Sequence, residues 1–313
     1  MNYAENIMYT GQLEYDKQFW NNMKGLPYAA DRLEKGRTIA TGTYVLPVSA
    51  DNKYESEINK VSIFRKIASV FTRYNGSVDI ITANSDDISA FVPENESINI
   101  KDIVDDFDTI KVKYNKLATL LRLPSDFVSD AAFNLEGYLL KRLAKSFARA
   151  EDKSFITGTG KNEPVGILHN TAGAETAITV DTITYDDMIS LYFSVKHEYR
   201  TNGVWLMNDK TALALRMLKD NTGNYIWNNT DNTIFGKPVI VSEYMPDIKA
   251  GQKPVAFGDF SYYWIVKRTP VSVKILQELF ALNHQTGYLA FEFIDGKLIR
   301  NDAVKVVEIS SDN

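Results

Sequence analysis

Apolar residues recur at steps of three and four between residues 129 and 157, which is the spacing of one face of an α-helix. The apolar stripe consists of Ala131, Leu135, Tyr138, Leu139, Leu143, Phe147 and Ala150. The polar positions between them are Glu136, Lys141, Arg142, Lys145, Arg149, Glu151, Asp152 and Lys153, and we expect all of these in water. The pattern predicts one helix from Ser129 to Thr157, roughly 43 Å long.

The glycines at positions 158 and 160 stop this helix and start a new unit. Gly160-Lys161 also matches half of a phosphate-binding loop, but Phe155 stands where the first glycine is required and Asn162 where a hydroxyl is required. The glycines also follow a helix, whereas phosphate binding needs them in front of one. We therefore interpret the segment as a helix stop and hinge.

Residues 1–42 show no regular apolar period, and several glycines interrupt them. Phe19, Trp20 and Tyr28 are large apolar groups that would promote association with other apolar surfaces if they were exposed to water. They either pack on their own domain or lie across a neighbouring subunit. We favour the neighbouring subunit, because the segment has no predicted element of its own.

A short strand is predicted at Thr43–Val48, followed by an amphipathic helix from Glu57 to Phe71. The next segment, residues 72–118, predicts a long two-stranded ribbon with strands at Ser77–Thr82 and Ile110–Tyr114. Such a ribbon is only marginally stable alone.

The charges of this ribbon suit docking onto a partner. Asp105 and Asp106 lie near the tip, and Lys111 and Lys113 form one face of the return strand. The alternative is an ordinary solvated hairpin, in which each charge contributes little.

Residues after 163 predict a compact region of helices and strands. Thr184 to Asp187 form a capping box that opens a helix through Tyr199, and Asn208 caps a second helix after a buried strand at Gly203–Met207. Later strands are predicted at Pro238–Val241, Pro254–Phe257, Tyr262–Val266, Val271–Leu276, Tyr288–Ile294 and Ala303–Ile309. Strands without intervening helices indicate an α+β fold with antiparallel pairing.

Composition narrows the function. The chain has 313 residues, enough for two core-bearing units, and no apolar run near the length of a membrane span. Cysteine is absent, which excludes disulfides, thiolate zinc sites and cysteine nucleophiles. The net charge of −5 argues against a broad nucleic-acid-binding face but leaves room for a local basic patch.

The sequence contains few residues in patterns that are typical of a catalytic or metal-binding site. His169, His197 and His284 are far apart and match no metal-binding pattern. The adjacent acids Asp86-Asp87, Asp105-Asp106 and Asp186-Asp187 point in different directions on any regular element, so they suit turns and caps. We predict no catalytic residues, no metal and no cofactor, and we expect that the chain is not an enzyme.

The order of parts resembles the major capsid proteins of tailed bacteriophages, the HK97-like capsid fold. The resemblance rests on segments that occur in family order between about residues 42 and 310. They are Ala150-Glu151-Asp152, Gly158-Thr159-Gly160, Glu163-Pro164-Val165-Gly166-Ile167-Leu168, Trp205-Leu206-Met207-Asn208, Leu218–Tyr225, Ile234-Phe235-Gly236-Lys237-Pro238-Val239, Met245-Pro246 and Phe257-Gly258-Asp259-Phe260-Ser261.

The resemblance implies a self-assembling shell subunit with five parts. They are an N-terminal arm (1–42), a peripheral domain (43–71 and 119–162, with the spine helix 129–157), an extended loop (72–118), an axial domain (163–256), and peripheral strands with a final strand that returns to the axial domain (257–313). Expected partners are further copies in hexamers and pentamers, a portal, a separate scaffolding protein and non-specifically bound DNA. About 40 residues precede Thr43, so a long scaffolding segment of its own is not expected.

Some relatives join a lysine of the extended loop to an asparagine of the peripheral domain near a glutamate. Here His284 takes the asparagine position and Phe291 the glutamate position, with Asn283 and Glu292 beside them. A slip of one residue on a strand reverses the side-chain face, so we do not expect cross-linking.

Three hypotheses remain at this point: a viral shell protein, an encapsulin-like shell of a bacterial compartment, and an unrelated soluble α/β enzyme.

Overall fold

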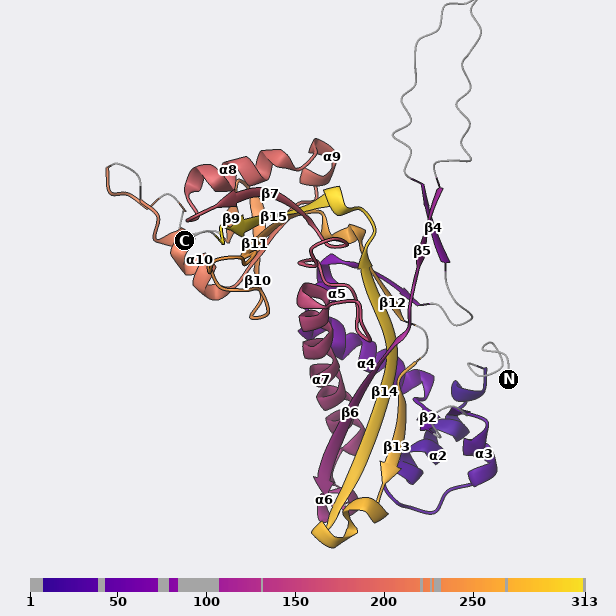
Figure 1. Ribbon diagram of the computed structural model, residues 1–313. Helices are drawn as coiled ribbons and strands as arrows, with labels where there is room; N and C mark the ends of the chain where they lie inside the picture. Colours follow the sequence, from indigo (N-terminus) through magenta and orange to yellow (C-terminus); the bar gives the residue numbers. More distant parts are fainter. Residues whose placement is uncertain are drawn as a thin grey trace, which may run out of the picture.

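The computed structural model describes residues 8–38, 43–72, 79–83, 107–130, 132–219, 222–225, 227, 232–267 and 270–311. Figure 1 shows an elongated part built along strand β14 and helix α7, and a compact part that carries α8, α9 and α10. We keep the terms peripheral domain for the first and axial domain for the second.

The spine helix α7 runs from Leu135 to Thr157. It begins six residues later than predicted, because Asp130 is extended and ends the separate short helix α6 (Ser125–Ser129), while Asn134 caps α7 by accepting the N–H of Gly137. Ala131 lies outside the described residues. The helix ends at Gly158 as predicted, where a Cβ would lie 2.2 Å from the carbonyl oxygen of Pro164.

The apolar stripe of α7 faces the core, with Leu135, Leu139, Leu143 and Phe147 at most 2% exposed. The predicted wet face is wrong at two positions, because Glu151 and Asp152 are buried as well. At the edge of the stripe, Ala150 is exposed.

The peripheral sheet has the order β1-β2-β13-β14-β12-β3, and β6 pairs with β14. Its strands are β1 (Arg37–Thr38), β2 (Thr43–Val45), β3 (Ser69–Thr72), β6 (Asn115–Pro124), β12 (Tyr263–Lys267), β13 (Ser272–Leu276) and β14 (Gln285–Leu298). The longest pairing joins β6 to β14 over ten residue pairs, from Pro124↔Gln285 to Asn115↔Ile294. The sequence did not reveal β6 as a strand.

The predicted helix Glu57–Phe71 is wrong in both bounds. Helix α4 runs from Val48 to Val61, and Ser62 is extended and separates it from the short helix α5 (Phe64–Ile67). Phe71 belongs to strand β3, which pairs in parallel with β12.

The expectation that residues 1–42 have no regular element is also wrong. Helices α2 (Leu13–Met23) and α3 (Ala30–Glu34) pack on their own domain, and Tyr15, Phe19 and Met23 are at most 1% exposed within its core. The hydroxyl of Tyr15 donates to the carbonyl oxygen of Val45 at 2.7 Å. The four-residue spacing of Tyr15, Phe19 and Met23 is a helical signal that the glycines obscured.

The axial sheet has the order β7-β15-β11-β8-β10-β9. Its strands are β7 (Glu175–Val180), β8 (Val204–Met207), β9 (Thr233–Ile234), β10 (Lys237–Val241), β11 (Val255–Gly258) and β15 (Val304–Ile309). Helices α8 (Tyr185–Ser194), α9 (His197–Arg200) and α10 (Asp209–Arg216) accompany it. The capping box at Thr184 and Asp187 and the Asn208 cap are confirmed, although Val195 ends the first helix earlier than predicted.

Leu143→Ala should lower the free energy of unfolding by about 2–5 kcal/mol, because Leu143 is 1% exposed and its loss leaves a cavity. Lys145→Ala, on the exposed face of the same helix, should change it by less than about 0.5 kcal/mol. Denaturant unfolding of both variants measures the difference. An unchanged Leu143→Ala would show that the stripe is not the core face.

Candidate assembly surfaces and the buried ion cluster

The predicted ribbon is present in the described residues. Strands β4 (Asp79–Ala83) and β5 (Phe107–Lys111) pair antiparallel, and within the described part of the chain no third strand joins them. Lys111 lies at the end of β5, Lys113 is exposed, and Asp105 and Asp106 lie outside the described residues. Their contacts with a partner stay predictions.

The predicted arm contacts separate into two groups. Phe19 has no exposed surface, so it contacts its own domain and is not available to a neighbour in this conformation. Trp20 is half-buried and Tyr28 is 42% exposed, so their interface role stays a prediction.

A row of basic side chains follows the outer face of α7. Lys141, Lys145, Arg149 and Lys153 stand at four-residue intervals, and all four are exposed. None of them forms an ion pair with a described acidic residue. Like charges at this spacing destabilise a helix by about 0.2–0.5 kcal/mol per pair. The row therefore favours an acidic partner, and its spacing was visible in the sequence.

The inner face of α7 ends in a buried ion cluster, which the sequence did not reveal. Arg65 of α5 donates to both carboxylate oxygens of Glu151, from Nε at 2.7 Å and from Nη2 at 2.9 Å. The same guanidinium contacts Glu55 of α4 at 2.9 Å and Glu292 of β14 at 3.3 Å. The side chains of Arg65, Glu151 and Glu292 have no exposed surface.

Lys267 of β12 is the second cation of the cluster. It bonds Glu55 and lies 3.7 Å from carboxylate oxygens of both Asp51 and Glu292. Tyr54 completes the site by donating to Glu292 at 2.6 Å. Four carboxylates thus surround two cations, and the cluster joins α4, α5, α7, β12 and β14.

Burial dominates the acid–base properties of two carboxylates of this cluster. It raises the pKa of Glu151 to about 7, although Arg65 beside it acts in the opposite direction. It also raises the pKa of Asp51. Close by, Asp152 accepts the hydroxyl of Ser62 at 2.7 Å and the backbone N–H groups of Ile63 and Phe64, so it holds the start of α5. A cluster with so little exposed surface positions helices and strands and offers no access to a substrate.

The positions considered for cross-linking lie apart. His284 has a left-handed backbone at the end of the 3-10 helix η3 (Glu278–Asn283), and Phe291 lies under the ammonium group of Lys116. Glu292 is engaged in the ion cluster and is 0% exposed. Its carboxylate is thus buried within its own subunit, so the absence of cross-linking stays a prediction.

Other candidate chemistry is weak in the described residues. No group of three or more His, Cys, Asp or Glu side chains there could hold a metal ion. His169 accepts backbone N–H groups of its own loop, including that of Ala172 at 3.2 Å. Among the described helices, none is long and apolar enough to cross a membrane.

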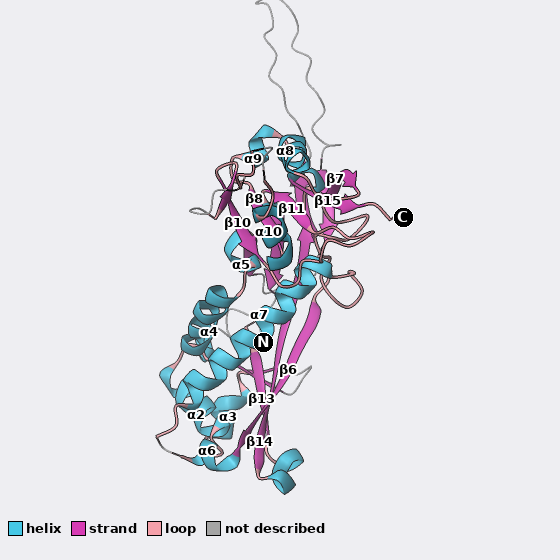
Figure 2. Cartoon of the chain, turned by 90° about the vertical axis from the view of Figure 1, so that its left-hand side faces the viewer, coloured by secondary structure: helices cyan, strands magenta, loops and turns pink. Residues whose placement is uncertain are grey.

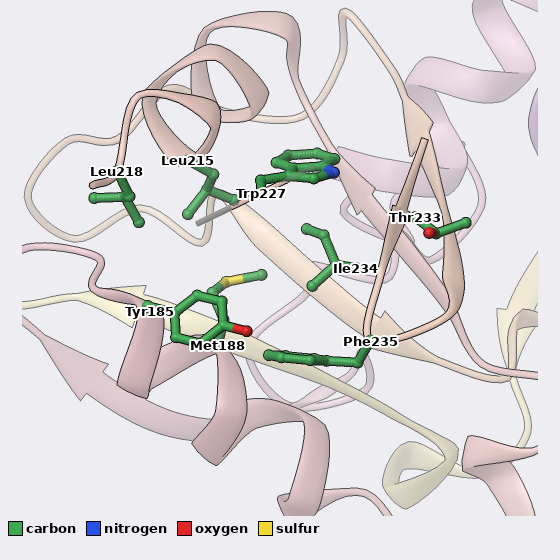
Figure 3. A pocket seen from close by; sticks show the side chains of 8 residues that line it. All are labelled: Tyr185, Met188, Leu215, Leu218, Trp227, Thr233, Ile234 and Phe235. Carbon is green, nitrogen blue, oxygen red and sulfur yellow. The ribbon is translucent and has the colours of Figure 1, made fainter. Parts of the chain in front are cut away.

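The axial domain contains an aromatic-lined cavity of about 200 Å³ (Figure 3). Its lining consists of Tyr185, Met188, Leu215, Leu218, Trp227, Thr233, Ile234 and Phe235. These side chains include no carboxylate, imidazole or amine, so the cavity offers no acid–base pair for catalysis.

A long spine helix, a protruding ribbon, an elongated peripheral domain and a separate axial domain define an HK97-like shell subunit. Residues 42–309 match the model of the family described as "Phage capsid family", so the chain belongs to the phage capsid family. This finding favours the viral-shell hypothesis over the other two.

Sequence relatives agree with the family assignment. The chain is 22% identical over 236 residues to the major capsid protein of Klebsiella oxytoca phage phiKO2, covering 71% of this chain and 55% of that protein. It is 28% identical over 155 residues to the capsid polyprotein of Pseudomonas phage PAJU2, covering 47% of this chain and 23% of that protein. The chain thus spans about half or less of the length of these curated relatives.

Solved structures share the fold. The capsid of a native GTA particle is 28% identical with a TM-score of 0.66, covering 79% of this chain and 89% of that one. A chain of Gordonia phage Cozz is 13% identical with a TM-score of 0.57, covering 80% of this chain and 86% of that one. At 13% identity, the second likeness concerns the fold alone.

Arg65→Ala should lower the free energy of unfolding by about 3–5 kcal/mol, because it leaves Glu151 and Glu292 buried without their partner. Arg37→Ala is the matched control, since its ion pair with Glu34 is about half exposed and should contribute less than about 1 kcal/mol. Denaturant unfolding compares the two. Equal losses would show that burial of the cluster has no energetic consequence.

Glu151 should contribute a fall in the stability of the wild-type chain as the pH rises from about 4.5 to about 7. The pKa of Glu151 is about 7 in the fold and 4.5 ordinarily, so the folded state binds the proton more tightly. Its contribution is complete below about pH 4.5 and is lost as the pH rises through about 7. Glu151→Gln should flatten this part of the curve of unfolding free energy against pH. A variant with the wild-type slope would contradict the assignment.

Proposed function

We propose that the chain is the major capsid subunit of an icosahedral phage head, and that it self-assembles into hexamers and pentamers around double-stranded DNA. The family match and the capsid relatives support this proposal. The proposed role is structural, because the chain belongs to the phage capsid family and its sequence relatives are capsid proteins.

The observation that carries the proposal is a pair of incomplete surfaces. The ribbon β4–β5 has no third strand in the described residues, and the outer face of α7 carries four cations that form no ion pair with a described acidic residue. Each feature is unfavourable in an isolated subunit, since short two-stranded ribbons are marginal and like charges repel. Both become favourable when a neighbour covers them.

The two surfaces complement each other in charge. Between β4 and β5, residues 84–106 contain seven acidic residues, including Asp105 and Asp106, and a single lysine. Figure 1 shows β4 and β5 on the opposite side of β14 from α7, so the ribbon projects away from the spine helix of its own subunit. We therefore place the acidic segment of one copy on the basic row of a second copy, where complementary charge would fix the register.

The remaining partners follow from the role. A portal, a separate scaffolding protein and non-specific DNA would complete the head, with assembly in the host cytoplasm and residence in the virion. Exposed Lys113, half-buried Trp20 and exposed Tyr28 are the further contacts that we assign to neighbours.

Reversing two charges of the basic row, Lys145→Glu with Arg149→Glu, should abolish particle formation while leaving the fold intact, because both side chains are exposed. Adding Asp105→Lys and Asp106→Lys should restore particles if the two surfaces meet. Particle yield by electron microscopy and melting of the unassembled chain are the measurements. Loss of particles without rescue would place the basic row against another partner, such as DNA.

Assembled particles boiled in detergent should give one band near 35.4 kDa on a denaturing gel. The reason is that Glu292 is buried and held within the ion cluster of its own subunit. A ladder of covalent multimers would show that cross-linking occurs despite His284 and Phe291.

A further inference from the structure

Strand β6 forms one edge of the peripheral sheet. It pairs with β14 from Asn115 to Pro124, and in the described ranges no second strand pairs with it. In an antiparallel pair every second residue directs its backbone N–H and C=O groups away from the partner strand. The described residues supply no backbone partner for these outward groups of β6. An uncovered edge of ten residues is a ready template for a strand from another chain.

A groove of about 420 Å³ lies between the start of this edge strand and the spine helix. Lys116 and Leu117 line it from β6, and Ala150, Lys153 and Thr157 line it from α7. In Figure 1, β6 lies between β14 and α7, so the uncovered edge of β6 is on the side of the helix. Ala150 and Thr157 are exposed, and their small side chains leave room for an extended chain beside β6.

Two lysines stand on the walls of the groove. Lys116 on β6 and Lys153 on α7 are exposed, and neither forms an ion pair with a described acidic residue. Lys116 lies over the ring of Phe291 at 3.8 Å, which leaves its ammonium group without a counter-ion there. Glu163 also lines the groove, but its carboxylate accepts the N–H and the hydroxyl of Thr159 at 2.9 and 2.8 Å. Positive charge beside an uncovered strand edge favours an acidic segment of extended chain.

We propose that residues 97–104 of a second copy add to the uncovered edge of β6 as an extended strand and fill this groove. The inference rests on the proposed function, because it says how the acidic segment of one copy binds beside the basic row of another. Backbone hydrogen bonds to β6 would provide the affinity, and alternate side chains in the groove would fix the register.

The sequence of this segment suits an added strand. Ile98 and Ile100 alternate with polar residues, and both are β-branched. Glu96 precedes residues 97–104 and Asp105 follows them, so acidic residues flank the strand at both ends. Their charge is opposite to that of the two lysines of the groove.

The segment is also long enough to reach along a neighbour. Ala83 ends β4 and Phe107 begins β5, so residues 84–106 can extend by roughly 35 Å in each of two legs. Strand β6, with ten residues, is about 33 Å long. Pro93 in the outgoing leg has no backbone N–H, which favours the return leg as the added strand.

Hydrogen exchange of the full-length chain before and after particle assembly tests the docking, with the particles dissociated only after labelling. In the unassembled chain the outward amides of residues 115–121 should exchange fast. In particles their exchange, and that of residues 97–104, should slow by at least about tenfold, because both strands gain backbone hydrogen bonds. Residues 287–291 of β14 pair on both sides and should exchange slowly in both states. Protection confined to one of the two segments, or unchanged exchange in intact particles, would overturn the strand addition and leave the proposed function standing.

Ala150→Trp tests the groove itself. The indole would occupy the space of the added strand, so the particle yield should fall by at least about tenfold. Melting of the unassembled chain should stay unchanged, since Ala150 is exposed. Ala250→Trp, at an exposed alanine of the axial domain, is the matched control and should assemble. Normal assembly of Ala150→Trp would overturn the docking, whereas a wild-type chain that forms no particles would contradict the proposed function and the docking with it.

Discussion

The buried contact between Arg65 and Glu151 is the constraint on which the rest of the subunit depends. Its two hydrogen bonds tie α5 to the end of the spine helix, and Glu292 extends the contact to β14. Buried ion pairs of this kind often add little net stability, since desolvation offsets attraction, but breaking one is costly. The cluster therefore acts chiefly by specifying how the elements meet. Few arrangements of these helices and strands give all four carboxylates and both cations their ionic and hydrogen-bond partners.

This specification matters because the two legs of the ribbon continue into β3 and β6, which pair with β12 and β14, the strands that carry Lys267 and Glu292. The outgoing leg follows α5 through β3, which pairs with β12 next to Lys267. The returning leg enters the sheet next to Lys113, whose backbone N–H donates to Asp295 of β14 at 2.7 Å. With both legs fixed at β12 and β14, the ribbon projects from a rigid base. The basic row lies on the opposite face of the same spine helix, and its four side chains are exposed. Figure 2 shows α7 on the side of the peripheral domain that faces the viewer. One helix thus carries the internal anchor and the proposed external surface.

The sequence predicted the elements whose signals are local. The apolar stripe of α7, the helix stop at Gly158, the cap at Thr184 and the late strands are confirmed, because periodicity and capping act within a few residues. The sequence did not predict the features that depend on contacts between residues far apart in the chain. Glu151 and Asp152 were assigned to water because their partners, Arg65 and Ser62, lie almost ninety positions away. Strand β6 was missed because its pairing depends on β14, and the burial of Phe19 was missed because its core neighbours lie far along the chain. The basic row was visible as four-residue spacing, but only the fold shows that it is uncovered.

The central claim is that the subunit is completed by its neighbours, with the acidic segment of one ribbon on the basic row of another copy. A cryo-electron microscopy reconstruction of self-assembled particles tests it most directly. The account predicts closed shells in which density for residues 84–106 lies along Lys141, Lys145, Arg149 and Lys153 of an adjacent subunit. A shell with this helix face open to the interior and the ribbon bound elsewhere would contradict the account.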